Sequence, residues 1–384
     1  MLASPFLGYI FSSGLLASIP IVLGAGLVVI NEIICCRGVN KKHALIILFW
    51  FPYVAWASLN YLRNPFEDNY LSSYFLTILL LPVMVLASIK LFVSENSHSN
   101  YVFIYKVLFV FLLLQLIVCF GQFSTYYFGV GFPVNEIYAH QGMISGTFFN
   151  SNDLGAAIVL VAFIAIGFEK FILKSNCYVL WLVIAVLLVV SGSRSAMLLG
   201  VLLFCFNKIR TLKEFLGFFF LFSFAGLFFS FFLFEVESNA VHRFLQRIES
   251  LLMVLSSGIQ ADNSMSIRLS SYVHFIGQLP ELGFGSGVIN NYFKYSDDAN
   301  FYGAELLFQN PHSLVVEIAY WLGWPGLLLF FVPVMVLLQF SRRKIQLAGV
   351  LLVVTMIPSS ILGGLVFFML AIFSFFDFDK HSGG

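Results

Sequence analysis

Long apolar runs alternate with short polar stretches along almost the whole chain. The runs fall near residues 6–36, 43–60, 70–92, 101–128, 147–168, 177–207, 215–234, 312–340 and 345–376. All of them approach or exceed the roughly 20 residues that an α-helix needs to cross the hydrocarbon core of a bilayer. The pattern therefore predicts an all-α polytopic membrane protein.

Three of these runs are too long, or too interrupted, for a single crossing. The first contains Ser12, Ser13 and Pro20. The sixth is divided by Ser191-Gly192-Ser193-Arg194, and the last by Pro358-Ser359-Ser360. Dividing each of the three into two helices gives about 12 transmembrane helices. The first run is longer than a signal-peptide core and has no positive segment ahead of it, so we expect it to be retained as membrane helix.

The polar residues divide the chain into three parts. Residues 1–234 are expected to hold about nine transmembrane helices, and residues 312–384 about three. Between them, residues 235–311 form the one large polar segment. Its stretches 239–256 and 264–279 predict two helices that lie at the outer interface, over the membrane bundle. A shorter outer loop, residues 129–146, contains His140.

The basic residues favour one orientation of these helices. With both chain ends in the cytoplasm, all but six of the 20 lysines and arginines lie towards the cytoplasmic side, as the positive-inside rule requires. The six outer residues are Arg63, Arg194, Arg243, Arg247, Arg268 and Lys294. Without a reversal at Ser191–Arg194, Lys174 and the basic residues between 208 and 213 would lie on opposite sides. This segment is therefore predicted to be a tight, outward-facing turn.

Composition supports the membrane assignment and excludes several other classes. The chain is 60% hydrophobic and 10% charged, with a mean hydropathy of +0.94, whereas a soluble domain carries about a quarter charged residues. The net charge of +1 does not point to any partner. The five cysteines have neither the spacing of zinc ligands nor that of a disulfide framework. We expect no metal ion, no cofactor and no nucleic-acid partner.

Arg194 and Arg268 are the leading candidates for substrate chemistry. A guanidinium beside hydrocarbon is costly unless it faces a polar partner or a water-filled cavity. Its fork of donors pairs bidentately with phosphate oxygens, so the two arginines could hold one pyrophosphate from two sides. Alternatively, Arg194 snorkels to the headgroups and Arg268 forms a loop salt bridge. Arg243 and Arg247 are further substrate-binding candidates, although a solvated or headgroup-binding face explains them better.

His312 lies where the large polar segment re-enters apolar sequence, followed by Ser313. An imidazole at an outer helix start could act as a general base on a sugar hydroxyl, because a helix N-terminus favours its neutral, proton-accepting form. It could equally be an interfacial residue that caps the helix. Glu317 lies deeper and could orient polar groups, or be paired for structural reasons.

Two further polar segments have simpler explanations. Asn152 and Asp153 precede an apolar helix and are predicted to cap it; the alternative is a polar wall of the substrate cavity. Residues 283–287 (Gly-Phe-Gly-Ser-Gly) do not follow a buried strand of a βαβ unit, so they are not a dinucleotide loop. We interpret them as flexible backbone near the mouth of the cavity. His140 is a further substrate-binding candidate.

Four segments, in this order along the chain, carry a resemblance that covers most of residues 146–330. With them the chain resembles the O-antigen ligase and polymerase superfamily of bacterial envelope glycosyltransferases. The segments are Gly146-Thr147-Phe148-Phe149-Asn150-Ser151-Asn152, then Ser191-Gly192-Ser193-Arg194-Ser195, then Ile267-Arg268-Leu269 with Leu282-Gly283-Phe284-Gly285-Ser286-Gly287, and finally Pro311-His312-Ser313-Leu314 with Glu317, Gly323 and Gly326.

The resemblance implies a metal-independent, inverting membrane glycosyltransferase of the GT-C type in the bacterial inner membrane. Its donor would be a glycan linked to undecaprenyl pyrophosphate, bound at the periplasmic face. Arg194 and Arg268 would bind the pyrophosphate and stabilise its leaving charge, and His312 would activate or position the acceptor hydroxyl. The family commonly has Asn where this chain has Ser313, which leaves the orientation of His312 open.

The function that we predict is polymerisation of lipid-linked repeat units in lipopolysaccharide or related polysaccharide biosynthesis. The alternative is an O-antigen ligase that transfers the finished glycan to lipid A-core, and a second alternative is a lipid-linked-sugar flippase. A transporter predicts repeat symmetry and charges at the midplane, whereas the charges here gather at the outer face. The expected partners are the donor, a glycan or lipid-linked acceptor, membrane lipid and a chain-length regulator protein.

Overall fold

The computed structural model describes residues 4–11, 14–35, 44, 47–63, 75–76, 78–93, 97–133, 144–148, 151–168, 174–208, 272–273, 275–277, 279–285, 300–301, 304–305, 313–340 and 349–351. Within these ranges the chain is almost wholly helical. The exception is one antiparallel pair of two-residue strands, β1 (Asn300–Phe301) and β2 (Ala304–Glu305), inside the large polar segment. The apolar run at 215–234, most of the run at 345–376 and the predicted helix at 239–256 lie outside the described residues.

The described helices follow the apolar runs of the sequence. They are α1 (Ser4–Phe11), α2 (Gly14–Cys35), α4 (Phe51–Arg63), α6 (Leu81–Val93), α7 (Ser97–Phe128), α9 (Ser151–Phe168), α10 (Lys174–Ser191), α11 (Arg194–Lys208) and α15 (Leu314–Phe340), with a short 3₁₀ helix, η3 (Leu279–Glu281). The sixth run divides after Ser191, which confirms that predicted division. The first run divides after Phe11, but α1 has 8 residues, too few to cross a bilayer by itself, so two transmembrane helices in this run stay a prediction. Pro20 lies inside α2 without ending it.

Several helices present long apolar side chains to their surroundings. Two segments, Val102–Tyr126 of α7 and Val315–Met335 of α15, are long and apolar enough to cross a membrane. On α7 the side chains of Phe103, Ile117 and Phe120 are more than half exposed. Such a continuous apolar surface would be costly in water but suits contact with lipid. The protein is a helical membrane protein, and the count of about 12 transmembrane helices stays a prediction.

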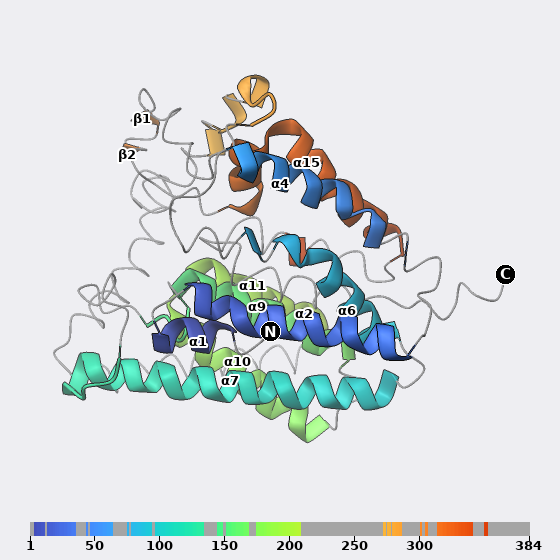
Figure 1. Ribbon diagram of the computed structural model, residues 1–384. Helices are drawn as coiled ribbons and strands as arrows, with labels where there is room; N and C mark the ends of the chain where they lie inside the picture. Colours follow the sequence, from blue (N-terminus) through green and yellow to red (C-terminus); the bar gives the residue numbers. More distant parts are fainter. Residues whose placement is uncertain are drawn as a thin grey trace.

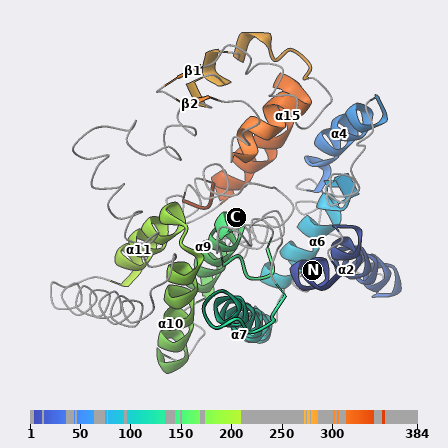
Figure 2. The ribbon, with the colours of Figure 1, turned by 90° about the vertical axis from the view of Figure 1, so that its left-hand side faces the viewer.

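The helices form two groups. One consists of α4 and α15, which pack along each other, and the other contains α1, α2, α6, α7, α9, α10 and α11, with α6 in contact with both α2 and α7 (Figures 1 and 2). At the centre of the second group, α9 contacts α7, α10 and α11, and every residue from Asp153 to Ile166 is buried. A helix that is apolar all round is expected to be surrounded by other helices. This central helix carries one of the candidate segments at its start.

A break in α15 anchors residues 283–285 of the large polar segment. Gly323 has φ 64° and ψ −162°, which interrupts the helix. The Trp324 N–H donates to the Gly283 carbonyl at 3.0 Å, and the Trp56 indole of α4 donates to the Leu322 carbonyl at 2.8 Å. These bonds satisfy backbone groups that the break would otherwise leave without a helical partner. In Figure 1, η3 lies beside α4 and α15 at this end of the molecule.

The same break corrects one interpretation of the sequence. A Cβ on Gly285 would collide with the backbone of residues 321–323, and a Cβ on Gly323 would collide with that of residues 283–285. The two backbones therefore touch directly, and only glycine permits this approach. For Gly283, Phe284 and Gly285, the expectation of flexible backbone is wrong: this loop is a packed junction between the polar segment and α15.

Candidate functional site

The segment Ser191–Arg194 forms the predicted tight turn. Gly192 has φ 63° and its N–H donates to the Val189 carbonyl at 3.1 Å, the usual way in which a glycine ends a helix. The Ser193 N–H donates to Ser191 Oγ at 3.3 Å. The Ser193 carbonyl accepts from the Met197 N–H at 2.9 Å, so Ser193 caps α11. Arg194 is consequently placed, by its backbone, at the first residue of α11.

The first turn of α9 lies directly against this turn. Ser193 Oγ donates to Asn152 Oδ1 at 3.0 Å. One turn further along α9, a Cβ on Gly155 would lie 2.7 Å from Ala196 Cβ and 3.0 Å from Ser193 Cβ. Only a glycine lets α11 begin so close to α9. Two segments that lie about 40 residues apart in sequence are thus one structural unit.

The first residue of α9 corrects the capping role predicted for Asn152 and Asp153. Helix α9 begins at Ser151, so both residues lie within its first turn and neither is the cap. The buried Asp153 still suits this place, because an acidic group near a helix N-terminus is favourable. Asn152, partly exposed, bonds to the turn that carries Arg194. Its role as a wall of the substrate cavity stays a prediction.

Two glutamines of α7, which the sequence analysis did not select, hold the chain just ahead of α9. Gln115 and Gln122 are fully buried, at 0% and 1% exposure. Between them they hydrogen-bond the segment from Ser145 to Thr147, which leads into α9. The signal that could have found them is their spacing, because two amides seven residues apart in an apolar run face the same side of a helix. Polar groups at such depth need a partner.

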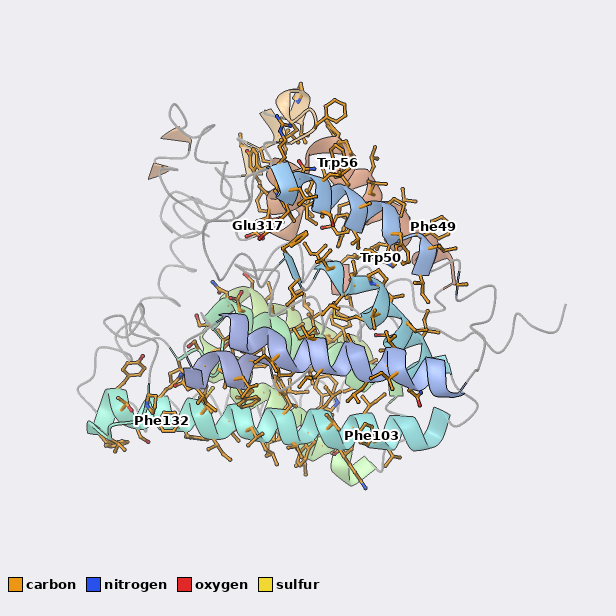
Figure 3. The ribbon with its side chains drawn as sticks, viewed as in Figure 1. Phe49, Trp50, Trp56, Phe103, Phe132 and Glu317 are labelled. Carbon is orange, nitrogen blue, oxygen red and sulfur yellow. The ribbon has the colours of Figure 1, made fainter. Side chains whose placement is uncertain are left out.

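At the start of α15, Ser313 rather than His312 is the cap. Its side chain is fully buried, its carbonyl accepts from the Glu317 N–H at 3.0 Å, and Val316 N–H approaches its Oγ at 3.5 Å. The helix begins at Leu314, so the prediction that His312 itself starts it is wrong by two residues. Glu317 is buried at 8% exposure, one turn beyond the cap. In Figure 3 it lies at the edge of α15 that faces the layer of α9 and α11.

The other candidate residues are not tested by the described part of the chain. His140, Arg243, Arg247, Arg268 and His312 lie outside it, and of Arg194 only the backbone is described. The structure therefore unites Asn152 with the turn of Arg194 and places Ser313 and Glu317 at the start of α15. The predicted pair of arginines stays a prediction. Among the described residues, no group of three His, Cys, Asp or Glu could hold a metal ion.

Comparison with known proteins identifies a domain over this part of the chain. Residues 178–331 match the family model described as O-antigen ligase. A search of curated proteins found no match. The matched segment runs from α10, through the Ser191–Arg194 turn and the glycine junction, into α15. These are the regions in which three of the four resembling segments lie, so the match supports the resemblance to the O-antigen ligase and polymerase superfamily over this part of the chain.

Proposed function

We propose that the protein polymerises oligosaccharide repeat units, linked to undecaprenyl pyrophosphate, into O-antigen or a related surface polysaccharide. The reaction takes place at the periplasmic face of the bacterial inner membrane. The observation that carries this proposal is the O-antigen ligase match, which includes the turn that fixes Arg194 at the start of α11. The periplasmic side follows from the distribution of basic residues.

Arg194 and Arg268 bind the pyrophosphate of the donor. The acceptor oxygen forms a bond to the anomeric carbon as the bond from that carbon to the pyrophosphate oxygen breaks, with inversion. Negative charge collects on the leaving lipid pyrophosphate, where two fixed guanidinium groups stabilise it. His312 takes the proton of the acceptor hydroxyl. The donor already stores the free energy of transfer, so the reaction needs neither nucleotide nor metal ion.

The position of Arg194 supports an anionic ligand. A cation in the first turn of a helix is opposed by the helix dipole, typically by about 0.3–1 kcal/mol. The first residue of α11 is therefore an unfavourable place for an arginine that merely lines the membrane surface. An anion bound there removes the conflict, because the guanidinium and the positive end of the helix dipole both attract it.

The polar residues around this turn complete the proposed site. Asn152, Ser313 and Glu317 contribute to substrate binding from α9 and α15, with Arg243, Arg247 and His140 contributing from the outer loops. The partners are the lipid-linked donor, a glycan or lipid-linked acceptor, the surrounding lipid and a chain-length regulator. The proposed layout is about 12 transmembrane helices, with residues 235–311 as the periplasmic segment between two helical parts, residues 1–234 and 312–384.

A ligase that transfers the finished glycan to lipid A-core is the second candidate. The match to the family model described as O-antigen ligase supports this reaction equally well. Both reactions use the same donor and break the same bond, so they differ only in the acceptor. A deletion strain distinguishes them. Loss of long chains with one unit still attached to the core indicates the polymerase, whereas loss of every attached unit with accumulation of lipid-linked polymer indicates the ligase.

Complementation of that strain tests the arginine. Arg194→Ala should abolish polymer while the protein stays in the membrane, and Arg194→Lys should retain part of it, because lysine keeps the charge but not the bidentate fork. The matched control is Arg63→Ala, which removes another outer arginine at the end of α4. Normal polymer from Arg194→Ala would contradict the pyrophosphate site. Unchanged polymer in the deletion strain, with only transport altered, would instead favour a flippase.

A further inference from the structure

We propose that Gln115 and Gln122 of α7 are positioning residues for the donor site, an inference that rests on the proposed function. They act through the backbone of residues 145–147 on the first turn of α9, and through it on the turn that carries Arg194. Neither glutamine lies in the segment matched to the family, residues 178–331. Their role follows from the hydrogen bonds of the described residues.

Both the oxygen and the nitrogen of the Gln122 side-chain amide hydrogen-bond the backbone just ahead of α9. Its Oε1 accepts from the N–H groups of Ser145 and Gly146, at 3.1 and 3.0 Å. Its Nε2 donates to the Gly146 carbonyl at 2.8 Å and to the Tyr9 hydroxyl at 3.1 Å. A side-chain amide has two donors and two acceptor lone pairs. All four are therefore used, and three of them bind the backbone of two consecutive residues.

Gln115, two helical turns earlier in α7, hydrogen-bonds both the backbone and the side chain of Thr147. Its Oε1 accepts from the Thr147 N–H at 3.1 Å, and its Nε2 donates to Thr147 Oγ1 at 2.6 Å. Gly146 lies between the two glutamines with φ 59°, and a Cβ there would meet Gln115 Oε1 at 2.5 Å. The segment thus follows one face of α7 closely enough that a side chain at position 146 would not fit.

The held segment also contacts α9. A Cβ on Gly146 would lie 3.2 Å from Cδ1 of Leu154, which is fully buried in the first turns of α9. In the same turns of α9, Asn152 Oδ1 accepts a hydrogen bond from Ser193 Oγ. Gly155, which has no side chain, lets Ser193 and Ala196 pack against the α9 backbone. A continuous set of contacts therefore runs from α7 through residues 145–147 and α9 to the residue next to Arg194.

Tyr9 of α1 extends this arrangement to the other end of the outer loop. Its hydroxyl accepts from Gln122 Nε2 and donates to the Pro133 carbonyl. Pro133 and Ser145 thus both connect to the Tyr9–Gln122 pair. Buried polar side chains in an apolar helix are costly unless they are hydrogen-bonded. Their presence suits a place where non-helical backbone must be held in one geometry within the membrane.

The first test measures polymer formation in the deletion strain. Gln122→Leu and Gln115→Leu should each lower polymer formation by about ten- to a hundredfold, since a displacement of about 1 Å at a reacting site can cost about 10²-fold. Thr147→Val, which removes only the hydroxyl bonded to Gln115, is the milder second variant. The matched control is Ser88→Ala, which removes a buried 2.9 Å hydrogen bond within α6. Leu variants that keep wild-type polymer levels would overturn the inference.

The second test measures the contact between α9 and the Ser191–Arg194 turn, and it needs no substrate. In a chain whose native cysteines are replaced, Asn152→Cys and Ser193→Cys should form a disulfide readily on mild oxidation, because the two side chains touch. Adding Gln122→Leu should slow its formation about tenfold while membrane insertion stays unchanged. An unchanged rate overturns the inference, as does a slowed rate with normal polymer from Gln122→Leu alone. Normal polymer from Arg194→Ala would refute the proposed function while leaving the disulfide result unaffected.

Discussion

Replacing Gly155 by alanine is the sharpest perturbation of the contact between α9 and the Ser191–Arg194 turn. The added Cβ would lie 2.7 Å from Ala196 Cβ and 3.0 Å from Ser193 Cβ. Carbon atoms in good contact are about 3.5–4.0 Å apart, so α9 and the start of α11 must separate by about 1 Å. The obstructing atoms are Cβ atoms fixed to the backbone, so a rotamer change cannot relieve the contact.

The free energy of unfolding should fall by about 1–3 kcal/mol in total. Overpacking of this kind costs about 1–3 kcal/mol. Alanine in place of glycine inside a helix recovers about 1 kcal/mol. The net destabilisation is therefore about 0–2 kcal/mol, and loss of the Ser193–Asn152 hydrogen bond adds about 1 kcal/mol. Activity should fall much further, by about 10²-fold, because a displacement of about 1 Å at a reacting group has that effect.

The assay combines two measurements on each variant: polymer length and amount in the complemented deletion strain, and thermal stability of the purified protein in detergent. Gly200→Ala is the matched control at the contact of α11 with its other neighbour, α10. There the added Cβ would meet only the end of the flexible Leu188 side chain, which can rotate away. Wild-type polymer from Gly155→Ala would refute the reasoning, and so would an equal loss from Gly200→Ala.

Three further predictions concern other parts of the structure. Gly323→Ala should destabilise the protein by at least about 3 kcal/mol, measured by thermal unfolding, because its backbone conformation is essentially restricted to glycine and the backbone of Gly285 blocks the Cβ. Ser313→Ala should lower the free energy of unfolding by about 1 kcal/mol because the cap of α15 is lost, and Ser313→Asn should retain the capping contribution; thermal unfolding measures both. A cysteine at Ser195 should react with a membrane-impermeant reagent from the periplasmic side, and reaction only from the cytoplasmic side would contradict the predicted orientation.

The sequence was informative wherever a local pattern and a global rule agreed. The reversal at Gly192 could be predicted because the serine–glycine pair interrupts an apolar run and because the basic residues require a reversal there. The division after Phe11 followed from polar residues alone. The family resemblance followed from the order of short segments, which the match to residues 178–331 supports over that part of the chain. These features depend on neighbours in sequence, or on charge counted over the whole chain.

The features that the sequence did not reveal depend on contacts between distant residues. Gln115 and Gln122 lie in an apolar run, and their partners are more than 20 residues away. The junction of Gly285 with Gly323 joins two segments whose contact no local pattern indicates, so a loop that is tightly packed was interpreted as flexible. The start of α9 was misplaced by two or three residues, because several polar residues in a row can each cap a helix.

The irregular backbone near the proposed site follows one physical rule. Within a bilayer, every N–H and carbonyl that a helix does not use must find another partner in the protein. At residues 145–147 the glutamines of α7 supply those partners, and at Gly323 they come from Trp56 and Gly283. The non-helical segments at residues 145–147 and 323 are therefore held in part by side chains of α7 and α4, two helices outside the resembling motifs. It follows that substitutions in α4 and α7 should impair activity even though neither helix carries a proposed catalytic group.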